Sequence, residues 1–385
     1  MAPRTRVKLV VEIAVTVVAV LMLFGAIRFN DAWVDRHFLP DFHQGREVYR
    51  AWEIAGRIAL ALIGLSMLLV VRPVLGRLAA RRSLRGLAVS AAPTLVAVAL
   101  ALVVTELVLR STYWRIANEA PASPEPRMQS DARLGWTFVP SRTAHALIGG
   151  RVVDYAFDAR GYRVPRVGVS PDPQLPTILF AGESILVGYG LQWSESVPAQ
   201  VQALTGVQAA NAAVAGYSTD QMYMRLSTEL PRFRRPAAVV MLFTPSLFAK
   251  NLSRNRPHLG PGLVWSPARQ PLRLEAITIH ALPYHSDRAI DAGVAETRSV
   301  LQAGVALARA RGATPLIVCP VFGEGEPMER DLRRRILDQG GLPYVLVRLD
   351  PSWRVPGDGH PDARGAKAIA AAIAARIDPH RAGAT

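Results

Sequence analysis

Cysteine is nearly absent from this 385-residue sequence, in which Cys319 is the only one. A single cysteine excludes an intramolecular disulfide framework and a thiolate metal site. Cys319 lies in the apolar run 315–321, so we interpret it as a small buried hydrophobic residue rather than a nucleophile. Histidine is also scarce, and His258, His280 and His285 lack the spacing of a helix-borne zinc pair. We therefore expect neither a metal site nor a cofactor.

Aromatic residues make up only 7% of the chain, although 50% of it is hydrophobic. The apolar excess lies in aliphatic runs near the N-terminus. Three runs are long enough to cross a hydrocarbon core of about 30 Å as helices: residues 9–27, 54–71 and 87–109. The charged residues inside them, Glu12, Arg57 and Glu106, lie near the ends of the runs, where they are tolerated. We predict three transmembrane helices and the lipid bilayer as a partner. A transporter subunit is poorly supported by so few spans.

The first run could instead be a cleaved signal peptide, because basic residues precede it. It is longer than the roughly 7 to 15 apolar residues of such a peptide, however, and no small-x-small cleavage site follows Ile27. We therefore interpret it as an anchor. The N-terminus and the loop 72–85 carry basic residues without acids, whereas the loop 28–53 balances both signs. Because short cytoplasmic loops concentrate Lys and Arg, the sequence predicts a multi-pass protein of the bacterial inner (cytoplasmic) membrane. Everything after Leu109 is then periplasmic or extracellular.

Acidic residues are too few to balance the basic ones, which leaves a formal net charge of +15. Residues 1–120 hold 15 Lys and Arg against 8 Asp and Glu, a surplus that membrane topology accounts for. The remaining charge is diffuse, with tight basic runs only at 232–235 and 333–335. A solvated helix face explains such runs, and attraction to anionic lipid or an anionic polymer is the alternative. We predict no nucleic-acid partner.

The remaining chain is typical of an α/β domain. A proline-rich stretch predicts a linker over 116–129, and the domain is expected to span 130–385, with a strand-rich opening over 134–164. Apolar runs of strand length then alternate with helical patterns, for example a helix over 291–310. This alternation predicts a three-layer domain with a parallel sheet. The expected strands are 177–181, 207–214, 237–244, 314–321 and 344–349.

Three residues suggest nucleophilic catalysis. Ser184 follows the strand 177–181 through a Gly182 turn, which is where doubly wound sheets bind ligands. A serine hydroxyl needs an imidazole to take its proton, and His360 can serve as that base. Asp358 can accept from the other ring nitrogen. Pro361, a residue favoured at the first helical position, follows His360, and we expect the last helix over 363–377. The catalytic hypothesis requires Ser184 and His360 to lie within hydrogen-bond reach of each other.

These residues resemble the motifs of the SGNH or GDSL-type serine esterases and acyl hydrolases. Residues 179–184 are similar to the first block of the family, with Glu183 in place of the usual Asp, and 211–221 resemble the second block. The motif Asp358-Gly359-His360-Pro361 resembles the last block, and the pieces 134–136 and 158–163 resemble membrane-anchored bacterial members. The resemblance covers roughly 130–378. It implies an SGNH-hydrolase-like domain, a triad of Ser184, His360 and Asp358, and backbone N–H groups of Ser184 and Gly216 that bind the oxyanion.

The third block of the family departs from its pattern. Residues 244–247 read Thr-Pro-Ser-Leu where the family has Gly-x-Asn-Asp, so the asparagine that completes the oxyanion hole is missing. Losing one such donor costs about 10²- to 10³-fold in rate, which leaves catalysis possible. Ser246 is the aligned candidate for the role and Asn251 the other. The third possibility is that this loop has lost the role.

Two functions follow as hypotheses. The first is a membrane-anchored serine esterase or O-acyltransferase that acts outside the cytoplasm on an acyl ester, such as the O-acetyl groups of a polysaccharide. That substrate is inferred from the location of the domain. The second is a catalytically impaired envelope protein that keeps the fold and binds a glycan or a protein partner, which the altered third block motivates.

Overall fold

A computed structural model describes residues 3–39, 42, 46–80, 84–111, 126, 128–253, 255–269, 272–275 and 284–377. The chain divides into two compact units, each made of separate segments. The first contains 1–38, 45–114 and 272–284, and the second contains 39–44, 115–271 and 285–385. Most of the predicted linker, 116–129, lies outside the described residues.

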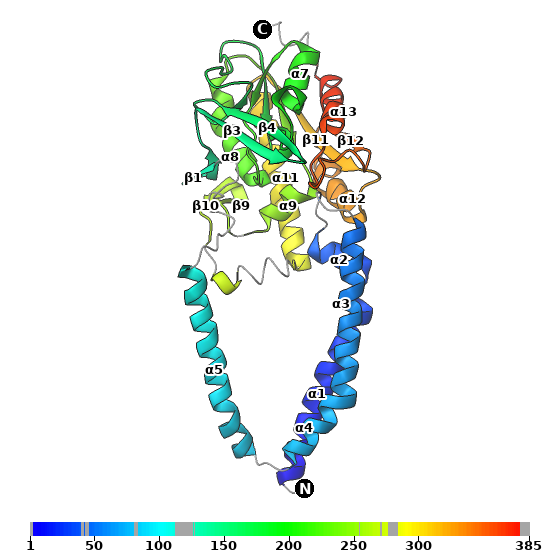
Figure 1. Ribbon diagram of the computed structural model, residues 1–385. Coiled ribbons are helices and arrows are strands. Elements are labelled where there is room, and N and C mark those ends of the chain that lie inside the picture. Colours follow the sequence, from blue (N-terminus) through cyan, green and yellow to red (C-terminus); the bar gives the residue numbers. More distant parts are fainter. Residues whose placement is uncertain are drawn as a thin grey trace. The chain divides into compact units, whose positions relative to one another are not determined.

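The first unit is helical (Figure 1). Its helices are α1 (Pro3–Arg28), α2 (Asp31–Phe38), α3 (Arg46–Ser66), α4 (Arg72–Ala79) and α5 (Leu84–Ser111). A π-helical turn, Met67–Val71, joins α3 to α4 just before Pro73, a residue that cannot donate a backbone hydrogen bond. Three helices are long and apolar enough to cross a membrane, over Arg6–Arg28, Arg50–Ala79 and Ala92–Leu109. They coincide with the three expected spans.

Charged groups within these helices have polar partners inside the first unit. Arg57 donates from Nε to the carbonyl oxygen of Ala26 at 2.9 Å. The carboxylate of Glu106 accepts the backbone N–H groups of Arg273 and Leu274, each at 2.9 Å. Burial of a charge without such partners is costly. Residues Arg273 and Leu274 are therefore held in the helical unit by specific hydrogen bonds.

The second unit is built on an eight-stranded sheet with the order β12-β11-β8-β6-β7-β5-β4-β3. The pairs from β12 to β7 are parallel, whereas β5, β4 and β3 add antiparallel strands at one side. The parallel strands are β6 (Thr177–Ala181), β7 (Gln208–Asn211), β8 (Pro236–Leu242), β11 (Thr314–Phe322) and β12 (Tyr344–Leu349). All five expected strands are present. The antiparallel ones are β3 (Arg142–Ile148), β4 (Arg151–Phe157) and β5 (Arg163–Val164).

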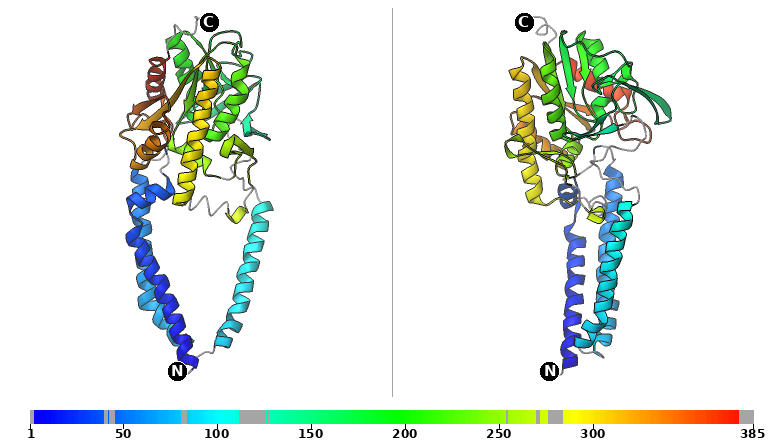
Figure 2. Two further views of the ribbon diagram at one scale, coloured as in Figure 1. Left: turned by 180° about the vertical axis from the view of Figure 1, so that it is seen from behind. Right: turned by 90° about the vertical axis from the view of Figure 1, so that its left-hand side faces the viewer.

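Helices cover both faces of this sheet, as Figures 1 and 2 show. One face carries α7 (Val197–Thr205) and α13 (Ala363–Ala374), which pack on each other. The other carries α8 (Thr219–Glu229), α9 (Pro245–Asn251) and α11 (Asp287–Ala310). Sheets covered on both faces have strands that are apolar throughout, and every residue of β6 is buried. The predicted fold class, a three-layer α/β domain preceded by three apolar helices, is confirmed.

Short elements complete the unit. They are β1 (Met128–Asp131), β2 (Gly135–Phe138), α6 (Ser184–Val187), β9 (His258–Gly260), β10 (Val264–Ser266) and α12 (Pro327–Arg333). The pairs β1-β2 and β9-β10 are separate two-stranded sheets. The strand-rich opening that the sequence predicts is thus divided between the β1-β2 pair and the antiparallel side of the main sheet.

Candidate active site

Ser184 lies at the carboxyl end of β6, where the strand turns into α6. Glu183 has extended backbone angles and precedes the first residue of that short helix. Gly182 allows the tight turn, because a Cβ atom there would stand 2.9 Å from both Leu186 Cδ1 and Leu242 Cβ. Side chains do not approach that closely without rearrangement. The local sequence therefore directs the Ser184 hydroxyl to the edge of the sheet where ligands of such folds bind.

Ser184, His360 and Asp358 form a continuous hydrogen-bonded chain. Ser184 Oγ lies 2.6 Å from His360 Nε2, and His360 Nδ1 bonds to Asp358 Oδ1. With the proton of the neutral imidazole on Nδ1, the Nε2 atom can accept the hydroxyl proton of Ser184. The ring of Tyr189 lies 4.8 Å from the imidazole, and burial raises the pKa of its phenol, which keeps it neutral. The structure thus brings together the three residues that the sequence proposes for catalysis.

The loop that carries His360 is held by backbone hydrogen bonds rather than by a helix. Val355 N–H donates to the carbonyl oxygen of His360 at 2.8 Å. Pro361 forms an isolated β-bridge with Arg354, and α13 begins only at Ala363, with Asp362 as its N-cap. The helix expected over 363–377 thus begins at the predicted residue, Ala363, and ends at Ala374, while Pro361 lies ahead of it. The Asp362 carboxylate, which accepts two backbone N–H groups, sets the start of that helix.

The two backbone donors expected for the oxyanion lie at the same edge of the sheet. Parallel pairing of β6 with β7 continues past both strand ends, since Val214 N–H donates to the Gly182 carbonyl at 3.1 Å. Ser184 and Gly216 each follow two residues later. Gly216 has φ +79°, a left-handed conformation that glycine adopts without strain. That the N–H groups of these two residues bind an oxyanion remains a prediction.

The residues of the third block, 244–247, form the start of α9. The two candidates for the missing oxyanion donor, Ser246 and Asn251, differ in their surroundings. Ser246 is buried in the first turn of α9, and its role in the oxyanion hole also remains a prediction. Asn251 is occupied elsewhere, because its Nδ2 donates to Thr297 Oγ1 at 2.8 Å and its Oδ1 accepts from Asp220 N–H at 3.3 Å. Both ends of that amide are engaged with partners other than Ser184.

Beside the nucleophile lies an ion pair between a buried carboxylate and a half-buried lysine, which sequence reasoning missed. The Glu183 side chain is fully buried and forms an ion pair with Lys250 from α9. Thr244 Oγ1 lies 3.5 Å from its other carboxylate oxygen. A buried carboxylate requires such compensation. The only signal in the sequence is that Lys250 follows the altered block by one helical turn.

Arg163 is a second residue that sequence reasoning missed as part of the site. Its buried guanidinium donates from Nη1 to the carbonyl oxygens of Val187 and Gly188, both at 2.6 Å, and from Nη2 to that of Leu191. These carbonyls end α6 and form the loop after it, so Arg163 fixes the helix that starts at Ser184. Burial lowers the pKa of Arg163 to about 10, which leaves it charged at neutral pH.

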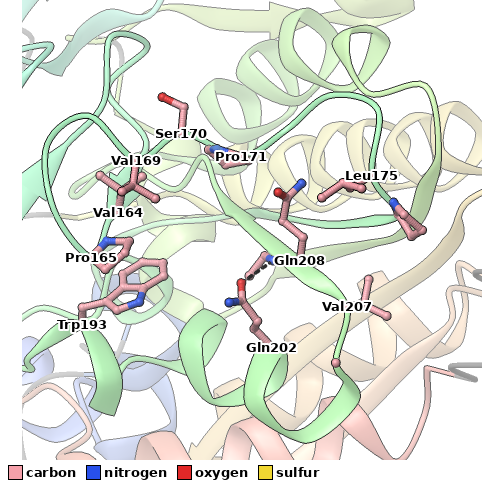
Figure 3. Close-up of a pocket in the computed structure, with 13 residues that line it drawn as sticks. Val164, Pro165, Val169, Ser170, Pro171, Leu175, Trp193, Gln202, Val207 and Gln208 are labelled. Carbon is pink, nitrogen blue, oxygen red and sulfur yellow. Dashed lines mark hydrogen bonds between the residues drawn. The ribbon is translucent and has the colours of Figure 1, made fainter.

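A cavity of about 580 Å³ lies at the amino ends of β6 and β7, the edge opposite Ser184 (Figure 3). Pro176 and Gln208 stand at the strand starts, and Trp193 and Gln202 line another side. The lining contains no titratable pair. This cavity is therefore separate from the candidate catalytic residues.

Among the described residues, no group of three or more His, Cys, Asp and Glu side chains could hold a metal ion. His258 lies 3.2 Å from Asp220 Oδ2 through Nδ1 and 2.6 Å from the Ser253 carbonyl through Nε2, so both of its nitrogens have protein partners. His280 lies outside the described residues. Cys319 is buried in β11, as expected, and burial raises the pKa of its thiol to about 12.

No protein-family model matches the sequence, and no curated protein matches it. The chain is similar to solved structures. One is a GDSL-like lipase from Bacteroides thetaiotaomicron VPI-5482, with 15% identity, a TM-score of 0.34, and 54% of this chain and 91% of that chain covered. A member of the lipolytic protein G-D-S-L family from Veillonella parvula DSM 2008 has 11% identity and a TM-score of 0.32, covering 52% of this chain and 96% of its own.

An acetyl xylan esterase from the rumen bacterium Butyrivibrio proteoclasticus has 9% identity and a TM-score of 0.35, with 54% of this chain and 64% of that chain covered. These neighbours are GDSL-family hydrolases and esterases, the family that the sequence blocks resemble. Identities and TM-scores this low carry no function across. A function for this chain is therefore argued from its own residues and the distances between them.

Proposed function

We propose that this chain is a membrane-anchored serine esterase or O-acyltransferase. The observation that supports it is the hydrogen-bonded chain from Ser184 Oγ through the His360 ring to Asp358. A hydroxyl 2.6 Å from an imidazole nitrogen, with a carboxylate on the opposite nitrogen, is the arrangement that activates a serine for acyl transfer. A merely structural serine has no need of this order of partners.

The reaction follows from those contacts. Ser184 Oγ attacks the acyl carbon while His360 Nε2 takes the hydroxyl proton, and Asp358 stabilises the imidazolium. The carbonyl oxygen becomes an oxyanion, which the N–H groups of Ser184 and Gly216 bind, with Ser246 as the third donor. Collapse of the intermediate breaks the ester bond, and His360 returns the proton to the leaving alkoxide. Water or an acceptor hydroxyl then releases the acyl group from Ser184 by the same steps in reverse.

The expected location of the second unit limits the classes of ester that it can meet. Three helices are suited to crossing a membrane, and the N-terminus and the loop 72–85 carry basic residues. Under the charge rule for loops, these features support a location of the second unit outside the cytoplasm of a bacterium. Esters available there include O-acetyl groups on envelope or secreted polysaccharides. We propose such a carbohydrate ester as the substrate class, and the bilayer as the anchor.

The test uses the full-length protein in detergent, with a short-chain nitrophenyl ester and an O-acetylated polysaccharide as substrates. Wild type should release nitrophenol and acetate, and Ser184→Ala should lose both activities. Ser266→Ala, a change of an exposed serine on β10, is the matched control and should keep them. Full activity of Ser184→Ala would refute the proposal.

The altered third block motivates one alternative, a catalytically impaired protein that binds a glycan or a protein partner. A fluorophosphonate probe separates the two functions, because it reacts only with an activated serine. Labelling that disappears in Ser184→Ala supports the enzyme. An unlabelled wild type that still binds polysaccharide supports the alternative.

A further inference from the structure

The segment Leu134–Gly135–Trp136 is joined by three hydrogen bonds to the loop that carries Gly216 and to the first turn of α8. Trp136 Nε1 donates to the Ala215 carbonyl at 3.0 Å. In return, Tyr217 Oη donates to the Trp136 carbonyl at 2.7 Å, and Gln221 Nε2 donates to the Leu134 carbonyl at 2.7 Å. The two segments lie about 80 residues apart in sequence, so this is a tertiary contact and no local turn.

The Trp136 bond acts on the peptide group that contains the Gly216 N–H. The Ala215 carbonyl and the Gly216 N–H belong to one planar trans peptide and point in opposite directions. An indole that holds the carbonyl therefore also sets the direction of the N–H. The ring lies against this glycine as well, since a Cβ atom at Gly216 would stand 3.3 Å from Trp136 Cζ2.

Arg256 holds the next peptide group. Its Nη1 donates to the Gly216 carbonyl at 2.8 Å and to Gln221 Oε1 at 3.1 Å, and its guanidinium lies 5.5 Å from the centre of the Trp136 ring. Arg256 is buried, so these bonds form in a setting of low dielectric, where they are strong. Both peptide groups that flank Gly216 are thus fixed by side chains from outside the loop.

We propose that Trp136 and Arg256 are positioning residues that aim the Gly216 N–H at the oxyanion of the reaction. The inference rests on the proposed esterase function. It gives the segment 134–136 a role that none of the motifs assigns to it. Such preorganisation matters because the Gly216 N–H is one of only three donors that the proposed reaction directs at the developing charge.

The experiment compares Trp136→Phe with Trp265→Phe in the full-length protein. Trp265 Nε1 makes the same kind of bond, to the Arg133 carbonyl at 3.1 Å, but touches neither peptide of Gly216. For Trp136→Phe we expect kcat to fall about 10- to 100-fold, less than for complete loss of one oxyanion donor, with KM nearly unchanged. Affinity for a trifluoromethyl ketone, which forms a charged tetrahedral adduct on the serine, should fall in parallel with kcat. Trp265→Phe should change neither.

A second pair of variants guards against a folding defect. Arg256→Met removes the donor to the Gly216 carbonyl, and Arg256→Lys restores a cationic donor at the same site. We expect the lysine variant to recover part of the kcat that the methionine variant loses, at equal KM.

The outcomes separate the two proposals. An active wild type whose Trp136→Phe variant keeps kcat and inhibitor affinity within about twofold would overturn this inference alone. Equal losses in kcat and in 1/KM would point to a general packing defect and overturn it too. A wild type that neither hydrolyses an ester nor transfers its acyl group to an acceptor would overturn the proposed function, and this inference with it.

Discussion

Removal of Lys250 should destabilise the second unit more than any change of an exposed charge. The Glu183 carboxylate is fully buried, and Lys250 is its ion-pair partner. Lys250→Met keeps the aliphatic length of the side chain and deletes the ammonium group. The variant leaves a buried carboxylate that has lost its compensating charge.

The size of the effect follows from this burial. Breaking a buried ion pair by removal of one partner costs about 3–5 kcal/mol, because the remaining charge stays desolvated. Thr244 Oγ1, at 3.5 Å, compensates little, and the nearby Arg256 guanidinium offsets part of the cost. We expect about 3 kcal/mol. For a domain of this size that corresponds to a fall of roughly 6–12 °C in the unfolding midpoint.

The assay is thermal unfolding of the full-length protein in detergent, followed by near-ultraviolet circular dichroism. Arg348→Met is the matched control, since Arg348 pairs with Glu324 at 2.7 Å but both side chains are more than half exposed. Its effect should stay below about 1 kcal/mol. The double variant Glu183→Gln/Lys250→Met should recover most of the lost stability, because the amide carries no charge to compensate. A Lys250→Met midpoint equal to that of Arg348→Met would refute the reasoning.

Three further predictions concern catalysis, thiol reactivity and pH. Asp358→Asn should lower kcat about 10⁴-fold in the nitrophenyl ester assay while Ser184 stays present, because the imidazole loses the carboxylate that orients it; a loss below tenfold would remove Asp358 from the mechanism. Cys319 should resist iodoacetamide at pH 8 in the folded protein and react after denaturation, as mass spectrometry can show, because burial raises the pKa of its thiol to about 12. Burial also raises the pKa of Glu329, so its charged form disfavours folding above its unfolded pKa of 4.5. Glu329→Gln should therefore unfold at a higher temperature than wild type at pH 7.5, with an advantage that disappears as the pH falls to about 4.5; an advantage independent of pH would contradict this.

Much of the fold could be predicted because its signals are local. The expected strands 177–181 and 344–349 coincide with β6 and β12, and the expected helix 291–310 ends with α11. Apolar runs bounded by turn residues are sufficient for this, since a strand covered on both faces must be apolar at every position. The three spans were predictable for the same reason, because a bilayer imposes a minimum length of apolar helix.

The supporting residues of the site were not predictable from such signals. Lys250 could as well have been a solvated helix residue, and Arg163 an ordinary surface arginine at a strand end. Trp136 belonged to a recognised sequence piece but had no role. The role of each residue depends on a partner that is distant in sequence. Rules of periodicity and helix capping consider only neighbouring residues, so they cannot predict such a partner.

Sequence alone determined the candidate chemistry of this protein: a serine after a glycine turn, a histidine and an aspartate two residues apart, and apolar helices ahead of them. Residue types at short spacings and the lengths of apolar runs are sufficient to predict those features. Only the tertiary structure decided that Ser184 and His360, separated by 176 positions, lie within hydrogen-bond distance. It also decided that the buried Glu183 carboxylate has the Lys250 ammonium group beside it, and that both peptide groups next to Gly216 are hydrogen-bonded to side chains. The physical reason is that these contacts depend on the spatial order of the strands in the sheet. That order is fixed only when the core packs.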